Sequence, residues 1–277
     1  MQPKAENLFI FSLILSILLL SQSALSQTRT FTKIQRFRAP EAHQGVAVGP
    51  DFVYPVTNRA IEKYAKESGE HLDTFVWPKD GPVIHMDSGV IHDGKLYASH
   101  SNYNDLPMAS SVEIHHAETL KHIGTHSFGI AWGSCTWIDR YDGAWWAVFA
   151  NYSRVFGPGS EPYGNSYYTT LVKFDDNWQK QEAWLFPDEV IEQAVPMSIS
   201  GGSWGPDGYL YCTGHDSTEI YVFQIPEAGS YLELIEEVPL NVHGQGIAWD
   251  RSRPGILYGI NRPTREVVVF RMEKSDR

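Results

Sequence analysis

The chain has 277 residues and a formal net charge of -11, which comes from 33 Asp and Glu side chains against 22 Lys and Arg. This acidic balance argues against nucleic-acid binding, because phosphate backbones are held by clustered Lys and Arg. A hydrophobic share of 42%, with 9 Trp, 14 Tyr, 13 Phe, 23 Gly and 16 Pro, excludes a disordered chain and favours short strands joined by tight turns.

The N-terminal segment has the features of an export signal. An apolar run at residues 8–20 follows a lysine and precedes the small residues Ala24 and Ser26. As a helix this run spans about 20 Å, short of the roughly 30 Å of a membrane core, although an N-terminal anchor is the alternative. We therefore predict a signal peptide at 1–26 and a secreted or periplasmic protein, without a membrane span after cleavage, consisting of one domain at 27–277.

A repeated hairpin pattern dominates the rest of the chain. Each copy has a small residue, an alternating apolar stretch, a turn with Gly or Asp, and a strand that carries an aromatic residue. The copies lie at 45–54, 89–97, 135–146, 202–211 and 246–258, so that their starts are 44, 46, 67 and 44 residues apart. Periods in the forties with paired short strands are typical of β-propeller blades.

Further apolar segments complete four strands per repeat. In the first four repeats they lie at 60–64 and 72–77, 111–114 and 122–126, 170–174 and 182–186, and 219–224 and 232–238. The fifth repeat has one such segment, at 266–271, and the segment at 30–37 can supply its missing strand. The sequence thus predicts an all-β protein, a five-bladed β-propeller whose ring is closed by an N-terminal strand joining the C-terminal blade. An open sandwich of similar hairpins is the alternative.

The repeat also predicts where a site lies. In a propeller, the starts of the innermost strands and the ends of the second strands surround the axis on one face. Polar residues gather at these positions, which suggests function because buried polar groups are costly unless they are used or satisfied. Those at innermost-strand starts are His43, Gln44, His85, Asp87, Ser134, Ser200, His243 and Gln245. Those at second-strand ends are Asn58, Arg59, His100, Tyr103, Asn151, Tyr152, His215, Asp216, Asn261 and Arg262.

These positions predict a His- and Arg-rich axial pocket for a small molecule or glycan. The expected catalytic residues are His43, His85 and His243. The expected substrate-binding residues are Arg59, His100, Tyr103, Asn151, His215 and Arg262. The sequence identifies no cofactor. A divalent metal ion in the axial channel stays an open alternative, with the same three catalytic histidines as its ligands.

The two cysteines leave their pairing open. Cys135 and Cys212 both lie in apolar, strand-like segments, and one disulfide or two separately buried thiols fit the sequence equally.

Four segments carry a resemblance to a known group of proteins. Residues 41–48, 110–114, 142–149 and 201–208 resemble stretches of secreted bacterial β-propeller proteins that are labelled cycloisomerases, and the likeness runs from about residue 38 to residue 270. The resemblance implies a propeller similar to muconate-cyclase and lactonase propellers. These enzymes act on small organic acids in a central pocket with His, Arg and Glu.

Three functions follow from these observations. The leading hypothesis is a lyase or isomerase that acts on a carboxylate-bearing carbohydrate or small organic acid, because His bases and Arg cations suit enolate chemistry. A glycoside hydrolase requires two carboxylates, for which Asp87 and Asp216 are candidates, with Glu161 on a loop. A non-catalytic ligand-binding or scaffold propeller is the third. We expect a monomer in each case.

Overall fold

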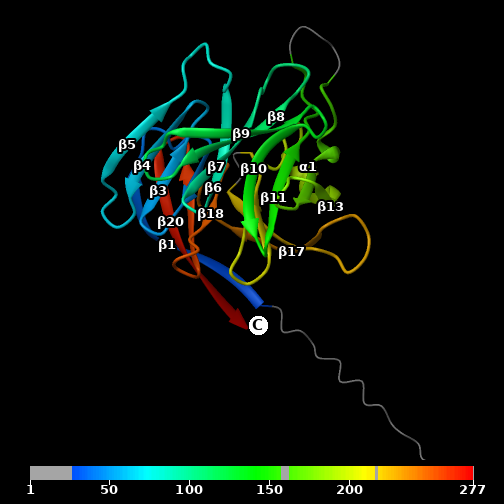
Figure 1. The fold of residues 1–277 in the computed structure, drawn as a ribbon. Coiled ribbons are helices and arrows are strands. Elements are labelled where there is room, and N and C mark those ends of the chain that lie inside the picture. The colour runs from blue at the N-terminus through cyan, green and yellow to red at the C-terminus, as the bar shows by residue number, and fades with distance from the viewer. Residues whose placement is uncertain (1–26, 157–161, 216–217, 277) are drawn as a thin grey trace, which may run out of the picture.

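Five four-stranded antiparallel sheets are arranged in a ring in the computed structural model (Figure 1). The structure describes residues 27–156, 162–215 and 218–276, so that the expected signal peptide lies outside the described residues. The chain is a five-bladed β-propeller, and the predicted fold is confirmed. No helix among the described residues has the length and apolar character needed to span a membrane.

Each of the first four blades is a continuous stretch of chain. Blade I contains β2 (Gly45–Val48), β3 (Phe52–Val56), β4 (Ala60–Ala65) and β5 (His71–Val76), and blade II contains β6 (His85–His92), β7 (Lys95–Ser101), β8 (Ser110–His116) and β9 (His122–Gly129). Blade III contains β10 (Ser134–Tyr141), β11 (Ala144–Ala150), β12 (Thr170–Phe174) and β13 (Lys180–Leu185), and blade IV contains β14 (Gly201–Trp204), β15 (Leu210–Thr213), β16 (Glu219–Gln224) and β17 (Glu233–Pro239).

Blade V is assembled from both ends of the described chain. Its strands are β18 (Ala248–Trp249), β19 (Ile256–Asn261), β20 (Glu266–Asp276) and β1 (Gln27–Arg38). The outer pair runs antiparallel from the Gln27–Asp276 pair to the Arg38–Glu266 pair. This confirms the predicted ring closure, and both strands extend beyond their predicted bounds. The pairing covers the outer edge of β20, and β1 becomes the outermost strand of blade V.

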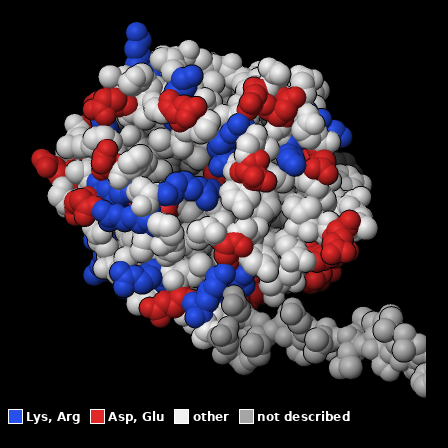
Figure 2. Space-filling model, turned by 60° about the horizontal axis from the view of Figure 1, so that its bottom comes forward, with Lys and Arg blue, Asp and Glu red and all other residues white. Residues whose placement is uncertain are grey.

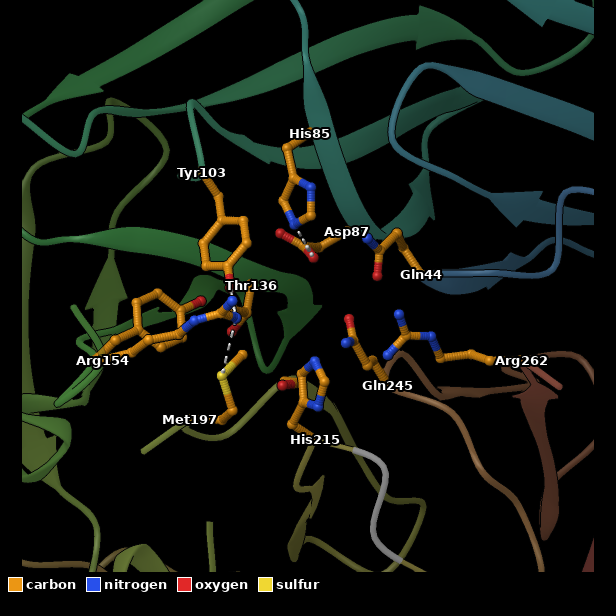
Figure 3. A pocket seen from close by; sticks show the side chains of 12 residues that line it. Gln44, His85, Asp87, Tyr103, Thr136, Arg154, Met197, His215, Gln245 and Arg262 are labelled. Atoms are coloured by element: carbon orange, nitrogen blue, oxygen red, sulfur yellow. Dashed lines mark hydrogen bonds and ion pairs between the residues drawn. The ribbon is translucent and has the colours of Figure 1, made fainter. Parts of the chain in front are cut away.

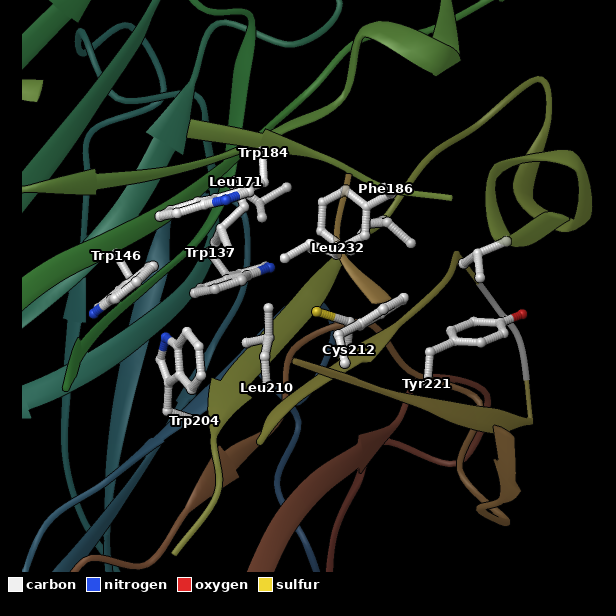
Figure 4. Packing of buried hydrophobic residues seen from close by; sticks show 14 of the residues in the cluster. Trp137, Trp146, Leu171, Trp184, Phe186, Trp204, Leu210, Cys212, Tyr221 and Leu232 are labelled. Carbon is white, nitrogen blue, oxygen red and sulfur yellow. The ribbon is translucent and has the colours of Figure 1, made fainter. Parts of the chain in front are cut away.

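Large aromatic side chains fill the spaces between neighbouring blades. Between blades III and IV, Trp137, Trp146, Trp184 and Trp204 pack with Leu210 and Cys212 (Figure 4). The ring centroids of Trp146 and Trp204 are 4.7 Å apart. The inner strands are buried along most of their length, since blades cover both of their faces. Cys135 and Cys212 are buried, unpaired thiols, which settles the question that the sequence left open.

Glycines let the inner strands approach one another closely at the axis. A Cβ atom added to Gly246 would lie 2.6 Å from the Cα atom of Gly45, and one added to Gly45 would lie 2.6 Å from the carbonyl oxygen of Asp87. No side chain larger than hydrogen fits at these contacts. The inner strands of neighbouring blades are therefore packed closely where these glycines lie.

The long third repeat contains two short elements that the sequence did not predict. A 3-10 helix, η1 (Ser166–Tyr168), follows β11, and a helix, α1 (Asp188–Ala194), connects blade III to blade IV. Val190 and Ile191 of α1 are buried against the tryptophan cluster. The extra length of this repeat is thus taken up by connections, and the number of blades stays at five.

Acidic and basic side chains are interspersed on the face shown in Figure 2. Some basic side chains are buried instead, namely Arg29, Lys63 and Lys66. Lys66 forms a buried ion pair. Its Nζ atom lies 2.9 Å from Oδ2 of Asp250, and it also donates to Ser252 and to the backbone of Gly49. This pair joins blade I to blade V, and every donor of the ammonium group is used inside the protein.

Candidate functional site

A cavity of about 220 Å³ lies on the axis at the end where the inner strands begin. All five blades or their connections contribute to it, as the sequence predicted for an axial pocket. Its lining consists of Gln44, His85, Asp87, Tyr103, Thr136, Tyr152, Arg154, Met197, Ser200, His215, Gln245 and Arg262 (Figure 3).

The local structure of β6 brings two titratable side chains to this cavity. The pairing between β6 and β7 shifts register between Met86 and Gly89, so that the strand bulges where Asp87 lies. His85 Nε2 is 3.3 Å from Asp87 Oδ1. Nδ1 is the ring nitrogen that this contact does not engage. A carboxylate beside a histidine orients the ring and stabilises its protonated form.

Tyr103 covers the histidine ring from one side. The two rings are stacked, with 4.8 Å between their centroids and 29° between their planes. The phenol oxygen of Tyr103 accepts a hydrogen bond of 3.0 Å from Arg154 Nη1. Burial raises the pKa of Tyr103, although Arg154 opposes this shift, so that the phenol stays protonated and retains its own proton for donation.

Two arginines from different blades reach the cavity from opposite sides (Figure 3). Arg154 follows β11, whereas Arg262 follows β19 and has its backbone amide bonded to the carbonyl oxygen of His243. Arg262 Nη2 donates to His43 Nε2 at 3.5 Å. With His85 and His215 also in the lining, the described walls hold more cationic than anionic capacity, which suits an anionic ligand.

Two buried oxygen atoms in the lining have no hydrogen-bond partner among the described residues. They are Oδ2 of Asp87 and Oε1 of Gln44, on side chains that are each 3% exposed. The amide nitrogen of Gln44 donates to Asn58 Oδ1 at 2.6 Å, so that the amide oxygen is the atom of this side chain left without a donor. Leaving a buried acceptor unsatisfied costs about 1–3 kcal/mol, so that a ligand or water that donates to these atoms is favoured.

The structure brings together some of the predicted site residues and separates others. His85, Tyr103, His215 and Arg262 line the cavity, and His43 contacts it through Arg262. The others lie outside the lining: Arg59, His100, Asn151 and His243.

Two of these four are held by backbone atoms. Arg59 Nη1 donates to the carbonyl oxygens of Val83 and Pro78, and Asn151 Nδ2 donates to those of Trp132 and Tyr168. Both side chains therefore fix connections between strands.

His100 has a structural role that the sequence did not suggest. Its Nε2 accepts from the backbone amide of Ile84 at 3.2 Å, so that Nδ1 carries the proton and donates to Ser111 Oγ at 2.8 Å. Ser111 in turn donates to the buried carboxylate of Glu113. Burial lowers the pKa of His100 to about 4, so that this ring is neutral near pH 7.

Thr136, Tyr152, Arg154 and Met197 also line the cavity, although the sequence did not single out their roles. Arg154 and Tyr152 follow β11, where the sequence analysis named Asn151 and Tyr152 at the strand end but not the arginine. Met197 lies between α1 and β14, and nothing in the repeat pattern marks that position. The signal that was available is the length of the connection, since long loops of a propeller often shape its ligand site.

The predicted metal ligands do not assemble in the described part of the chain. No three or more His, Cys, Asp and Glu side chains among these residues are grouped to hold a metal ion, and His43 and His243 lie outside the lining that contains His85. The second carboxylate of the hydrolase hypothesis, Asp216, and Glu161 lie outside the described residues.

The fold and the cavity together define a five-bladed propeller with an axial cavity, and a solved structure with a TM-score above 0.5 agrees with the fold. Neither a protein-family model nor a curated protein matches the chain. The PQQ-bound form of aldose sugar dehydrogenase from Streptomyces coelicolor is similar over 89% of this chain and 99% of that chain, with 9% identity and a TM-score of 0.54.

Two further structures are more distant. Kuenenia stuttgartiensis hydrazine synthase is 12% identical over 82% of this chain and 70% of that chain, with a TM-score of 0.44. The WD40 β-propeller domain of Doa1 is 10% identical over 82% and 77%, also with a TM-score of 0.44. At these identities the likeness is one of fold alone. The likeness to the aldose sugar dehydrogenase supports the propeller part of the resemblance found in the sequence, but not the name cycloisomerase.

Proposed function

We propose that this protein is a lyase or isomerase that removes the proton from the carbon next to a carboxylate, in a carbohydrate acid or another small organic acid. The observation that carries the proposal is the His85–Asp87 pair, at 3.3 Å, in the same cavity as Arg154 and Arg262. This combination supplies a base, a group that orients it, and cations for the charge that develops on the substrate.

The reaction begins with binding of the carboxylate by the arginines. His85, oriented by Asp87, takes the proton from the neighbouring carbon, and the electron pair of the C–H bond moves toward the carboxylate to give an enolate-like species. Arg262 stabilises the added negative charge. Asp87 stabilises the imidazolium that forms, since it lies beside the same ring.

The second half of the reaction needs an acid. In a lyase, the electron pair forms a carbon–carbon double bond while the bond from the β-carbon to oxygen breaks, and the departing oxygen takes a proton. Tyr103 is protonated and stacked on His85, and is the donor that we propose. In an isomerase, the proton returns to the substrate carbon from the other side or to a neighbouring atom.

We propose that the protein is exported by residues 1–26 and acts as a monomer on a small-molecule or glycan substrate. A glycoside hydrolase stays a second candidate through Asp87, whose partner carboxylate would come from residues outside the described ones.

Exchange of the substrate proton tests the reaction class directly. Sugar acids incubated with the protein in D₂O should incorporate deuterium next to the carboxylate, seen by NMR, and a lyase should also give an unsaturated product that absorbs in the ultraviolet. The His85→Gln variant should lower the rate by about 10²–10⁴-fold, because it removes the base. His116→Gln, an exposed residue of blade II, is the matched control and should retain the rate. Exchange that persists in His85→Gln, or no exchange with any acid, would refute the proposal.

A further inference from the structure

The unsatisfied acceptors in the cavity indicate which neutral groups the ligand carries in addition to its charged group. Asp87 Oδ2 and Gln44 Oε1 are buried, and they lack donors among the described residues. Each of these side chains already uses its other polar atom, since Asp87 Oδ1 lies beside His85 and Gln44 Nε2 donates to Asn58. The remaining atoms can only accept, and both side chains belong to the cavity lining.

We infer that the substrate is a polyhydroxy acid, in which hydroxyl groups near the carboxylate donate to Asp87 and Gln44 while the carboxylate is held by Arg154 and Arg262. This inference deepens the proposed function and rests on its carboxylate-binding site. A hydroxyl group is the matching donor because it is neutral. A cationic donor such as an ammonium group would be repelled by the two arginines.

The arrangement of the lining agrees with a ligand of mixed character. In Figure 3, Gln44 and Asp87 lie beside one another at one part of the cavity, whereas Arg154 and Arg262 approach from opposite sides. A cavity of about 220 Å³ has room for several water molecules or for a small polar ligand such as a sugar acid. The hydroxyl groups of such a ligand supply the donors that Asp87 Oδ2 and Gln44 Oε1 lack among the described residues.

An acid without hydroxyl groups fits this cavity poorly. A muconate-type acid, which the resemblance found in the sequence would imply, satisfies the arginines but displaces water from the two acceptors without replacing its hydrogen bonds. Sites built to bond a hydroxyl group discriminate strongly against analogues that lack it. The cavity should therefore prefer sugar acids to unsaturated or saturated apolar acids.

Three matched ligands of six carbons separate the contributions. Calorimetry of the purified protein uses three ligands. D-gluconate carries both hydroxyl groups and a carboxylate, hexanoate carries a carboxylate alone, and D-glucitol carries hydroxyl groups alone. D-glucuronate and cis,cis-muconate add a ring form and the implied apolar acid. We expect one of the two sugar acids to bind at least tenfold more tightly than hexanoate, muconate and glucitol. Equal or tighter binding of hexanoate or muconate, or no binding of either sugar acid, overturns the inference.

A pair of variants locates the discrimination. Gln44→Leu should reduce the affinity for the preferred sugar acid about tenfold and leave hexanoate unchanged, whereas Arg262→Gln should weaken both acids alike. The ligand comparison uses the unaltered protein, so that it stays decisive even if Gln44→Leu fails to fold. Preference for sugar acids without proton exchange would refute the proposed reaction and leave this inference standing. Proton exchange with an apolar acid that binds as tightly as the sugar acids would support the proposed reaction and refute this inference.

Discussion

At the scale of single residues, neighbours in the sequence have different fates at the cavity. Gln44 lines it whereas His43 reaches it through Arg262, and Tyr152 lines it whereas Asn151 bonds to backbone carbonyls. Successive side chains of a strand point to opposite sides, so that a shift of one position exchanges the inward and outward residues. The repeat located these positions. Which of two neighbouring side chains faces the cavity depends on bulges that the sequence does not reveal.

Arg154 shows the same limit in a loop. The sequence predicted Arg59 and Arg262 among the substrate-binding residues. The structure has Arg154 opposite Arg262, with Arg59 bonded to two carbonyl oxygens. The position of a residue in a long loop does not show whether its side chain reaches the cavity. Fold and blade number followed from the period alone, whereas this residue required the path of the loop.

Arg154→Gln should therefore weaken binding of the preferred acid. We expect about a tenfold loss of affinity by calorimetry, since one of two cations at the carboxylate is removed. Arg265→Gln, a partly exposed arginine whose Nη1 lies near the carbonyl oxygen of Pro40, is the matched control. Unchanged affinity in Arg154→Gln would show that this arginine does not contact the ligand.

At the scale of elements, β7 and β8 hold a chain of hydrogen bonds from the amide of Ile84 through His100 and Ser111 to Glu113. The chain needs a neutral ring at His100, because Nε2 accepts from an amide. Protonation would replace that acceptor with a second donor. Blade II is thus sensitive to acid at a buried point, below the surface of the cavity.

His100→Gln should flatten the dependence of stability on pH. Burial lowers the pKa of His100 to about 4 in the folded state, so that the unfolded chain binds the proton more readily. The stability contributed by the neutral ring is complete above about pH 6.5 and is lost as the pH falls toward 4, by about 3 kcal/mol.

Denaturant unfolding at pH 7 and pH 4.5 measures this effect. The variant should lose less stability than the unaltered protein over that interval. Some loss should remain, because burial also lowers the pKa values of His115 and His126. The exposed His116→Gln variant should follow the unaltered protein, and parallel profiles for all three proteins would contradict the assignment.

At the scale of the whole molecule, one arginine connects the closing strand to the neighbouring blade. Arg29 of β1 is 3% exposed, and its guanidinium lies 3.2 Å from Asp207 and 3.0 Å from Glu236, both in blade IV. Its Nε atom also donates to the hydroxyl of Tyr211 at 2.8 Å. Removing one member of such a buried network leaves charges without their partner, which is strongly destabilising.

Arg29→Met should reduce the free energy of unfolding by about 2–4 kcal/mol, less than the full value for a buried pair because Lys274 also lies 2.9 Å from Asp207. Arg36→Met is a matched control on the same strand, since its pair with Glu266 is largely exposed and should contribute less than about 1 kcal/mol. Denaturant unfolding at neutral pH compares the two. Similar losses in both variants would show that the network of Arg29 adds nothing to the closure.

The overall charge and the charge of the cavity differ in sign. The chain carries a formal charge of -11, yet the described lining contains two arginines and two histidines with one carboxylate. A negative net charge disfavours the binding of polyanions, while cations gathered in the described lining favour a small anionic ligand. Composition predicted the first property, and the convergence of distant strand ends creates the second.

The pairing of β1 with β20 also sets an order of events in folding. Blades I to IV can each form from a local stretch, but blade V joins residues more than 200 positions apart, and such contacts form late because closing a long loop is entropically unfavourable. Until the last strand has been made, β1 has no sheet to join. We therefore expect the ring to close in the last step of folding. A chain that ends before β20 leaves the ring open, with unpaired strand edges.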